Sequence, residues 1–516
     1  MRLMKAHILL PVLLGLTIQS HAEIVLPRFF SDHMVLQREK PAAIWGTAKA
    51  GSTVTVTFMG KTATTTADAA GTWKAGIGPF DASSEGSALT ITDGTDSKTL
   101  NDVLVGEVWF ASGQSNMQWA LAQTEAAQDQ IATADRPGIR FFMTQLTTAP
   151  EPKSDVPGAW QVCTPQVAGR FSGVGYYFAR KLHQELGVPV GVIQAAWGGK
   201  PVETFTSREA LASIPEGRIQ LESYEKALAA YDAEKEKARH LEAMKKWEKN
   251  METWRASQGA AKGKPPVKPK ANENPGIVPG KPTTIYNGMI APFIGCTIRG
   301  AIWYQGEANA KTPESALAYG KLFPLMIRDW RDRWGDDFRF LWVQLANFGQ
   351  SVAEPGTDNP WAALQDQQRR SLTVEKSGMA VINDIGTWNN IHPPNKKDVG
   401  ERLARWTLAD DFGKDLVKCG PLYKEHKING PRITVTFDHT GKGLKSADGG
   451  SLKRFEIQDY DGNWYWAHAK IEGDTVVVSS AEVPRAAAAR YAWSSNPTGA
   501  NLVNSEGLPA SVFTTE

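Results

Sequence analysis

The chain has few cysteines, no excess of charge of either sign and no long hydrophobic run in its interior. Its 516 residues contain three Cys, and 57 Lys and Arg stand against 55 Asp and Glu. Cys163, Cys296 and Cys419 are too far apart for a zinc ribbon or finger, and no His-x-x-x-His pair occurs, so neither a metal site nor a cofactor is predicted. Buried, unpaired thiols are the expectation, with one disulfide and a free thiol as the alternative.

The balance of charge and the length exclude further classes. A near-neutral chain lacks the basic surface of a nucleic-acid-binding protein, so no nucleic-acid partner is expected. With 41% hydrophobic and 22% charged residues, the composition is that of a globular protein and not of a disordered or fibrous one. The length suggests about three domains.

The N-terminus has the layout of a secretory signal peptide. Arg2 and Lys5 precede an apolar run over 8–18, and 20–22 form a small-x-small cleavage pattern. We therefore expect 1–22 to be removed and the protein to be exported, either periplasmic or extracellular; a buried N-terminal helix is the alternative. The apolar run is too short to span a membrane, and no later stretch reaches about 18 uninterrupted apolar residues, so no membrane span is expected after signal removal.

The rest of the chain has three successive sequence patterns. Residues 23–104 alternate β-branched and polar residues between Gly-rich turns, which predicts an N-terminal β-sandwich. Residues 105–415 alternate apolar runs with helical patterns, which is typical of an α/β domain on a parallel sheet. Residues 416–516 return to the β pattern and predict a second sandwich.

The α/β part yields explicit element predictions. Strands are expected at 106–111, 189–195, 299–304, 338–345 and 379–385, and helices at 174–186, 316–334, 361–372 and 397–409. Within it, 216–282 reads as an insertion: a charged helix or helical hairpin to about 256, then an extended Pro- and Lys-rich segment. A solvated helix with a linker is favoured there over a partner-binding arm.

Polar loops follow four of the predicted strands, at the edge where parallel sheets carry their active sites. Ser115 lies at a strand-to-helix turn, where it suits either a nucleophile or an N-cap. Gly198 and Gly199 could offer backbone N–H groups to a substrate oxygen, or form a plain turn. Asn309 could donate to an oxyanion or cap a helix. His392 supplies the base that a hydroxyl nucleophile needs, although a lone His is more often structural.

Motifs at these loops resemble the sialate O-acetylesterase family of SGNH hydrolases. The residues that carry the resemblance are 113–117, 303–309, 391–393 followed by Lys396 and 399–404, and the tail segments 491–493 and 501–509. The resemblance covers almost the whole chain after the signal. It implies a flavodoxin-like SGNH hydrolase domain flanked by N- and C-terminal β-sandwiches, and a carbohydrate esterase activity.

The resemblance also implies residue roles. Ser115 would be the nucleophile and His392 the base, with the N–H of Ser115, an N–H of Gly198 or Gly199, and Asn309 as oxyanion donors. Gln114, Gln305, Glu307 and Trp388 are the expected substrate-binding residues.

The sequence departs from the SGNH pattern at the third member of the triad. The family places Asp two or three residues before the His, and here Asn390 and Asn389 stand at those positions. Asp384 is the preferred substitute, Glu307 the second, and a Ser-His dyad supported by a backbone carbonyl is also open.

The family name and the Trp residues of the site loops point to an O-acetylated glycan. Sialic acid is the leading substrate, with acetylated xylan or another polysaccharide as the alternative within the same chemistry. Sialic acid needs a cation for its carboxylate, and Lys200, Arg369 and Arg370 are the candidates. A glycan-binding protein that lost turnover is the alternative from another class; a lipase is disfavoured because Ser115 lacks the G-x-S-x-G context.

Overall fold

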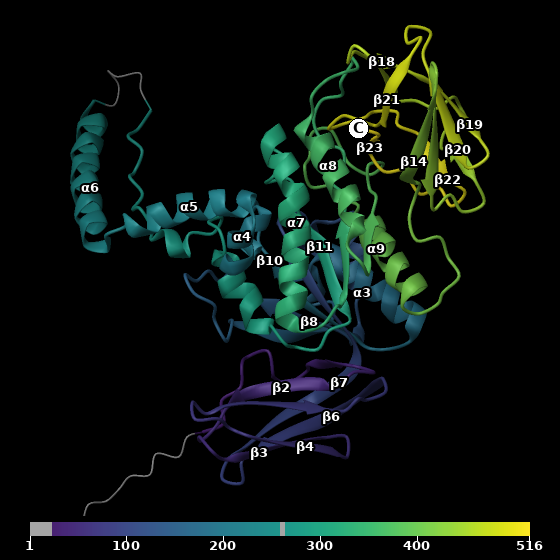
Figure 1. The fold of residues 1–516 in the computed structure, drawn as a ribbon. Helices are drawn as coiled ribbons and strands as arrows, with labels where there is room; N and C mark the ends of the chain where they lie inside the picture. Colours follow the sequence, from purple (N-terminus) through teal and green to yellow (C-terminus); the bar gives the residue numbers. More distant parts are fainter. Residues whose placement is uncertain (1–22, 258–263) are drawn as a thin grey trace, which may run out of the picture.

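The centre of the molecule is a mostly parallel sheet. The computed structural model describes residues 23–257 and 264–516 (Figure 1). The strands lie in the order β13-β12-β11-β7-β10-β8-β9, and every neighbouring pair is parallel except β8 and β9. Their bounds are β7 Ser97–Gly113, β8 Arg136–Thr144, β9 Gly158–Cys163, β10 Val190–Ala196, β11 Gly300–Tyr304, β12 Arg339–Val343 and β13 Ser377–Ala380.

The strand order reverses at β7. After β7 the chain builds β8 and β10 on one side and then β11, β12 and β13 on the other, so β10 and β11 both flank β7. In open α/β sheets, a crevice forms beyond the carboxyl ends of the strands at such a reversal. The residues that follow β7 therefore occupy the position where a ligand site is expected.

Helices cover both faces of this sheet. Trp109 and Phe110 are neighbours on β7 and so point to opposite faces. Trp109 packs on Phe178 of α3, and Phe110 packs on Trp330 of α7. The α-helices are α1 Ser115–Gln118, α2 Ala127–Ala132, α3 Gly173–Leu186, α4 Arg208–Ser213, α5 Pro215–Ala229, α6 Ala233–Ala256, α7 Pro313–Trp334, α8 Pro360–Arg370 and α9 Lys396–Asp410. The expected α/β sheet is confirmed with shifted strand and helix ends, but β8 and β9 were not among the expected strands.

The N-terminal part is joined to the central sheet through one long strand. The first half of β7 pairs antiparallel with β6, and its second half lies between β10 and β11. The expected boundary at 104 thus falls inside a continuous strand. The strands of this part are β1 Val35–Gln37, β2 Ala42–Thr47, β3 Thr53–Phe58, β4 Lys61–Thr66, β5 Thr72–Ile77 and β6 Ser83–Thr92, with β2 and β5 forming a separate antiparallel pair.

The C-terminal part contains two four-stranded antiparallel sheets, β14-β15-β20-β19 and β18-β17-β21-β23. Side chains from both sheets, such as Val435 and Ile457, share one buried apolar cluster, as sheets packed face to face do. The strands are β14 Leu422–Asn429, β15 Arg432–Asp438, β16 Leu444–Ser446, β17 Phe455–Asp459, β18 Trp464–Trp466, β19 His468–Glu472, β20 Thr475–Ser479, β21 Ala486–Tyr491, β22 Leu502–Asn504 and β23 Phe513–Thr514.

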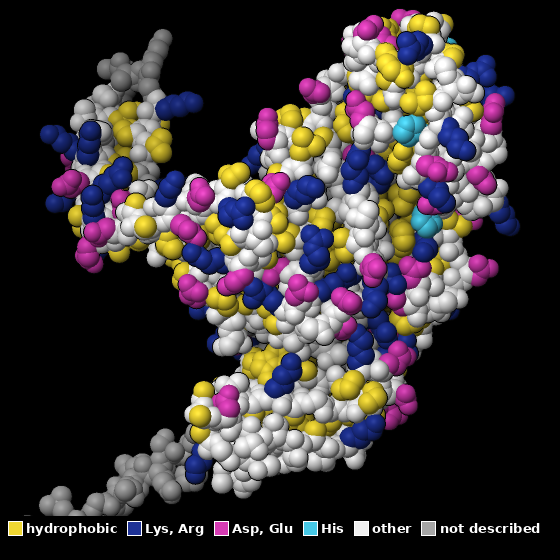
Figure 2. All heavy atoms as spheres, viewed as in Figure 1, with side chains coloured by type: hydrophobic (Ala, Val, Ile, Leu, Met, Phe, Trp, Pro, Cys, Tyr) yellow, Lys and Arg dark blue, Asp and Glu magenta, His cyan; other side chains and the backbone are white. Residues whose placement is uncertain are grey.

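The expected charged insertion forms a helical arm. Helices α5 and α6 extend away from the central sheet (Figure 1), and α6 has no buried residue. Side chains of both charge signs cover the arm (Figure 2). The solvated-helix interpretation fits this exposure.

Two other expectations can be compared with the described residues. Cys163, Cys296 and Cys419 are buried and unpaired, as predicted. In the described part of the chain, no helix is both long and apolar enough to cross a membrane. The predicted signal peptide, 1–22, lies outside the described residues.

Candidate functional site

The turn that carries the predicted nucleophile, Ser115, follows β7 directly. Ser115 is the first residue of α1, and its half-buried hydroxyl lies 2.8 Å from Nε2 of His392. The backbone at Gly113 has φ +134, and a Cβ there would lie 2.2 Å from the carbonyl oxygen of Tyr304. Only glycine fits such a close approach of two strand ends. The end of β7 is thus shaped to present Ser115 beside β11.

The predicted base, His392, is held in a loop between β13 and α9. The backbone N–H of His392 donates to Asn390 Oδ1 at 2.9 Å, and its ring stacks on Trp119 with centroids 4.4 Å apart. Burial lowers the pKa of His392 below its usual 6.5, and the nearby Lys396 ammonium lowers it further. A neutral imidazole beside a hydroxyl is the state that a general base needs.

The expected triad carboxylate is not at His392. Both oxygens of the exposed Asp384 accept from Arg402, each at 2.7 Å. Glu307 accepts from Asn116 Nδ2 at 2.6 Å. Among residues 23–257 and 264–516, no carboxylate lies within ion-pairing distance of the His392 ring, and its Nδ1 has no hydrogen-bond partner.

Beneath the Ser-His pair lies a buried polar network. Asn116 accepts a hydrogen bond from Lys396 Nζ and donates to Glu307 Oε1 and to the Ile391 carbonyl. Burial raises the pKa of Glu307, against the effect of its hydrogen bond from Asn116. Burial lowers the pKa of Lys396 to about 7, with Glu307 acting in the opposite direction. The network ties β11, the nucleophile turn and the histidine loop together.

Of the residues predicted to donate to an oxyanion, Gly198 lies against Ser115. A Cβ on Gly198 would be 3.2 Å from that of Ser115, so the two residues are in contact. The Gly198 N–H donates to Gln118 Oε1 at 2.9 Å, whereas the N–H groups of Ser115 and Gly199 have no partner in the described part of the chain. Of the two glycines, Gly199 therefore has the free donor.

The third predicted donor, Asn309, is fixed by its neighbours. Its Oδ1 accepts from Val202 N at 3.0 Å and from Gln305 Nε2 at 2.7 Å, and its Nδ2 donates to Glu203 Oε2 at 3.1 Å. These bonds use one of the two amide hydrogens, which leaves the other for a ligand. Burial raises the pKa of Glu203.

The residues predicted to bind substrate divide into two groups. Gln114, Gln305 and Glu307 are buried, and their side chains bond to protein groups around Ala308, Asn309 and Asn116. Trp388 is 57% exposed in the histidine loop. Of the four, Trp388 alone is exposed, and the other three are held by bonds within the protein.

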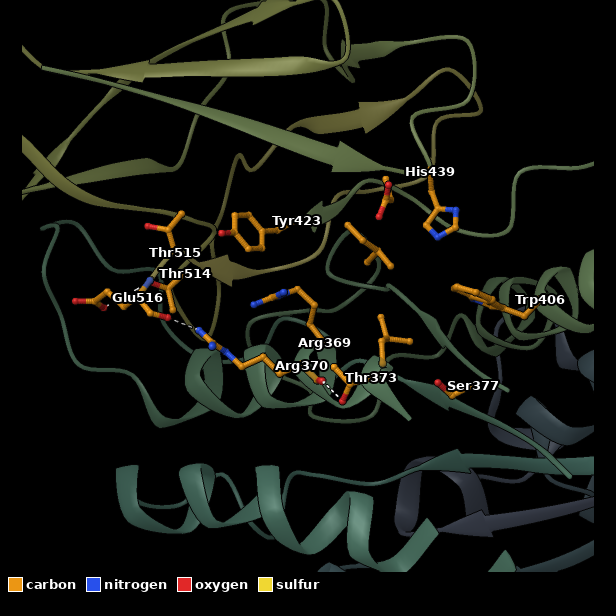
Figure 3. Close-up of a pocket in the computed structure, with 13 residues that line it drawn as sticks. Arg369, Arg370, Thr373, Ser377, Trp406, Tyr423, His439, Thr514, Thr515 and Glu516 are labelled. Atoms are coloured by element: carbon orange, nitrogen blue, oxygen red, sulfur yellow. Dashed lines mark hydrogen bonds between the residues drawn. The ribbon is translucent and has the colours of Figure 1, made fainter. Parts of the chain in front are cut away.

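The three candidate cations lie in two different parts of the structure. Arg369 and Arg370 both pair with Asp366, and they line a pocket of about 630 Å³ between α8 and the C-terminal strands, opposite Tyr423 (Figure 3). Neither Ser115 nor His392 lines that pocket. Lys200 lies in the loop that carries Gly198, with its ammonium 6.0 Å from the centre of the Trp197 ring.

Sequence reasoning gave no role to Trp119, Asn116, Lys396 or Glu203. Trp119 and Lys396 each stand four residues after a catalytic candidate, Ser115 and His392 respectively. In the helical turn of α1 that spacing returns Trp119 to the side of Ser115, and for Lys396 the available signal was its place in the motif that follows His392. Within the described ranges, no group of three or more His, Cys, Asp or Glu side chains is arranged to hold a metal ion.

Comparison with known proteins gives consistent similarities. Residues 274–409 match the family model described as carbohydrate esterase, sialic acid-specific acetylesterase. The chain is 28% identical to a sialate O-acetylesterase of Rattus norvegicus over 94% of this chain and 93% of that one. It is 26% identical to the Homo sapiens sialate O-acetylesterase over 76% and 72% of the two chains. A solved carbohydrate acetylesterase from Xanthomonas citri superposes with a TM-score of 0.78 at 34% identity, covering 96% of this chain and 99% of that one.

Proposed function

Because this chain belongs to the sialate O-acetylesterase family and is a carbohydrate O-acetylesterase, we propose that it removes O-acetyl groups from glycans by a Ser-His acyl-enzyme mechanism, with O-acetylated sialic acid as substrate. The observation that carries the mechanism is the 2.8 Å contact between Ser115 Oγ and His392 Nε2. It lies beyond the end of β7, where the strand order reverses.

The chemistry is acyl transfer in two halves. His392 Nε2 takes the Ser115 proton as Oγ attacks the acetyl carbonyl, and the imidazolium then gives that proton to the glycan oxygen as it leaves. A water molecule, activated by the same imidazole, hydrolyses the acetyl-enzyme. No residue other than Ser115 has to form a covalent bond.

The oxyanion of each tetrahedral intermediate would be met by three donors. These are the N–H of Ser115, the N–H of Gly199 and the free amide hydrogen of Asn309. Ser115 also begins α1, although so short a helix contributes mainly through this first N–H. Removing one such donor typically costs about 3–4 kcal/mol of barrier.

The choice of sialic acid is supported by charge. The Lys200 ammonium pairs with no carboxylate in the described part of the chain, and it lies two residues from Gly198, which contacts Ser115. An acidic sugar could place its carboxylate there while its acetyl group reaches Ser115.

The exposed face of Trp388 supports the second candidate, an acetylated neutral polysaccharide such as xylan, because a flat aromatic surface suits a sugar ring. We also propose that 1–22 direct export, so that the enzyme acts on glycans outside the cytoplasm.

The test is acetate release by residues 23–516 from p-nitrophenyl acetate, beside Ser115→Ala and His392→Ala. Both variants should lose nearly all activity while they keep the wild-type melting temperature. O-acetylated sialic acid and acetylated xylo-oligosaccharides then decide the substrate. A folded wild type no faster than Ser115→Ala would contradict the esterase mechanism and leave glycan binding without turnover as the function.

A further inference from the structure

We propose that Trp119 takes over part of the role of the missing triad carboxylate, by positioning the His392 ring and stabilising the imidazolium that forms during acyl transfer. The inference rests on the Ser-His mechanism proposed above. It assigns to Trp119 a positioning role, since the indole acts on the reaction through His392.

The two rings lie face to face. Their centroids are 4.4 Å apart and their planes differ by 16°. Stacking on one face leaves the ring edge free, and on that edge Nε2 is 2.8 Å from Ser115 Oγ. In a triad, a carboxylate bonded to Nδ1 sets the orientation of the imidazole; here Nδ1 has no hydrogen-bond partner among the described residues. The stacked face supplies the orientation instead.

Trp119 is itself held firmly. It is the C-cap of α1, and its Nε1 donates to the carbonyl of Gln123 at 3.1 Å. The side chain of Gln123 in turn accepts from the Ala120 N–H at 3.2 Å. Ser115 and Trp119 are thus the two ends of one five-residue segment. A shift of that segment moves the nucleophile and the ring under His392 together.

The electrostatic part follows from the proton balance. The Ser115 O–H bond breaks as the Oγ–carbon bond forms, and the proton moves to Nε2, so His392 becomes positively charged. It stays charged until the proton goes to the departing glycan oxygen. The face of an indole is electron-rich and attracts a cation within about 6 Å. The charged groups near His392 are Lys396, which opposes the imidazolium, and the buried Glu307 behind Asn116.

The experiment compares Trp119→Phe with Trp119→Leu. Both cover the imidazole with an apolar side chain, but only Phe presents a π face. We expect kcat/KM for p-nitrophenyl acetate to fall about three- to thirty-fold further in the Leu variant than in the Phe variant. The acid limb of the pH–rate profile should also lie at lower pH in the Leu variant, because its imidazolium is less stable.

Trp466→Leu is the matched control. Trp466 is also partly exposed and donates its Nε1 to a backbone carbonyl, that of Ala353, but it lies in β18 of the C-terminal part. This variant should retain wild-type kinetics. If Trp119→Leu does not fold, pentafluorophenylalanine placed at position 119 replaces it: this ring keeps the shape of Phe and reverses its quadrupole, so it should lose activity relative to Phe.

The role of Trp119 would be overturned if the Trp119→Phe and Trp119→Leu variants had the same kcat/KM and the same acid limb of the pH–rate profile. The proposed function fails by a different result, namely full activity of Ser115→Ala. The two failures are therefore distinguishable in one set of assays.

Discussion

Asn116 Nδ2 lies 3.0 Å from the carbonyl oxygen of Ile391, so the residue after Ser115 holds the residue before His392. The two residues are far apart in the sequence: Asn116 lies in α1, just after β7, and Ile391 lies in the loop between β13 and α9. The same amide also bonds to Glu307 and Lys396. A third side chain therefore ties the turn of Ser115 to the loop of His392, and no carboxylate of the described residues aligns the imidazole.

Asn116→Ala should lower kcat about ten- to a hundredfold, because a displaced base loses its alignment with Ser115. It should also lower the free energy of unfolding by about 1–3 kcal/mol, since Glu307 and Lys396 lose buried partners. Steady-state kinetics and thermal unfolding measure the two effects. Asn389→Ala, in the exposed part of the same loop, should change neither; equal kinetics for both variants would contradict the role of Asn116.

Lys396→Met should change how stability depends on pH. The folded-state pKa of Lys396 is lowered from 10.5 to about 7, because burial disfavours the charged form. Between those two values the unfolded chain binds a proton that the folded chain does not, so the wild type gains stability as pH rises, by at most about 1.4 kcal/mol per pH unit.

The wild type should therefore become more stable relative to Lys396→Met from about pH 7 to about pH 10, as followed by chemical unfolding. Lys397→Met, at an exposed neighbouring position, is the control and should show no such trend. If the difference in unfolding free energy between the wild type and Lys396→Met stayed constant or shrank with rising pH, the effect of burial on Lys396 would be refuted.

Asp384→Ala should leave turnover within about twofold of wild type. The Asp384 carboxylate is exposed and bonded to Arg402, away from the His392 ring. Kinetics with p-nitrophenyl acetate measure this directly. A loss of a thousandfold or more, which is the order expected when a triad Asp is altered, would show that Asp384 reaches His392 during catalysis.

Lys200→Gln should separate acidic from neutral substrates. With the ammonium removed, kcat/KM for O-acetylated sialic acid should fall about tenfold, because a charge-assisted hydrogen bond is lost. Activity on acetylated xylo-oligosaccharides should not change. Arg370→Gln, at the pocket of Figure 3, is the control and should affect neither substrate. An equal loss on both substrates would mean that Lys200 supports the loop and does not recognise the carboxylate of the substrate.

The order of strands and helices in the α/β part was predictable because buried parallel strands are continuous apolar runs. Strand β8, Arg136–Thr144, was missed because Pro137 and Gly138 at its start indicate a turn. The expected strand over 379–385 is instead Ser377–Ala380, and the chain has left the sheet before Asp384. Asp384 was placed at a strand end by this error in the boundary.

Ser115 and His392 were predictable from their places after strands and from the resemblance of their motifs. Their actual support was not, because it depends on contacts across the sheet. The bonds of Asn116 join segments that are distant in the sequence, and the stacking of Trp119 on His392 follows from how two loops meet. Local patterns carry no information about either.

The most direct measurement of the central claim is to trap the acetyl-enzyme. The protein is mixed with p-nitrophenyl acetate, quenched in acid within one turnover and digested, and the peptide with Ser115 is examined by mass spectrometry. We expect an added acetyl group on Ser115 that decays with time in water and is missing in Ser115→Ala. Turnover with no acetyl group on Ser115, or with acetylation of another residue that accounts for the rate, would contradict it.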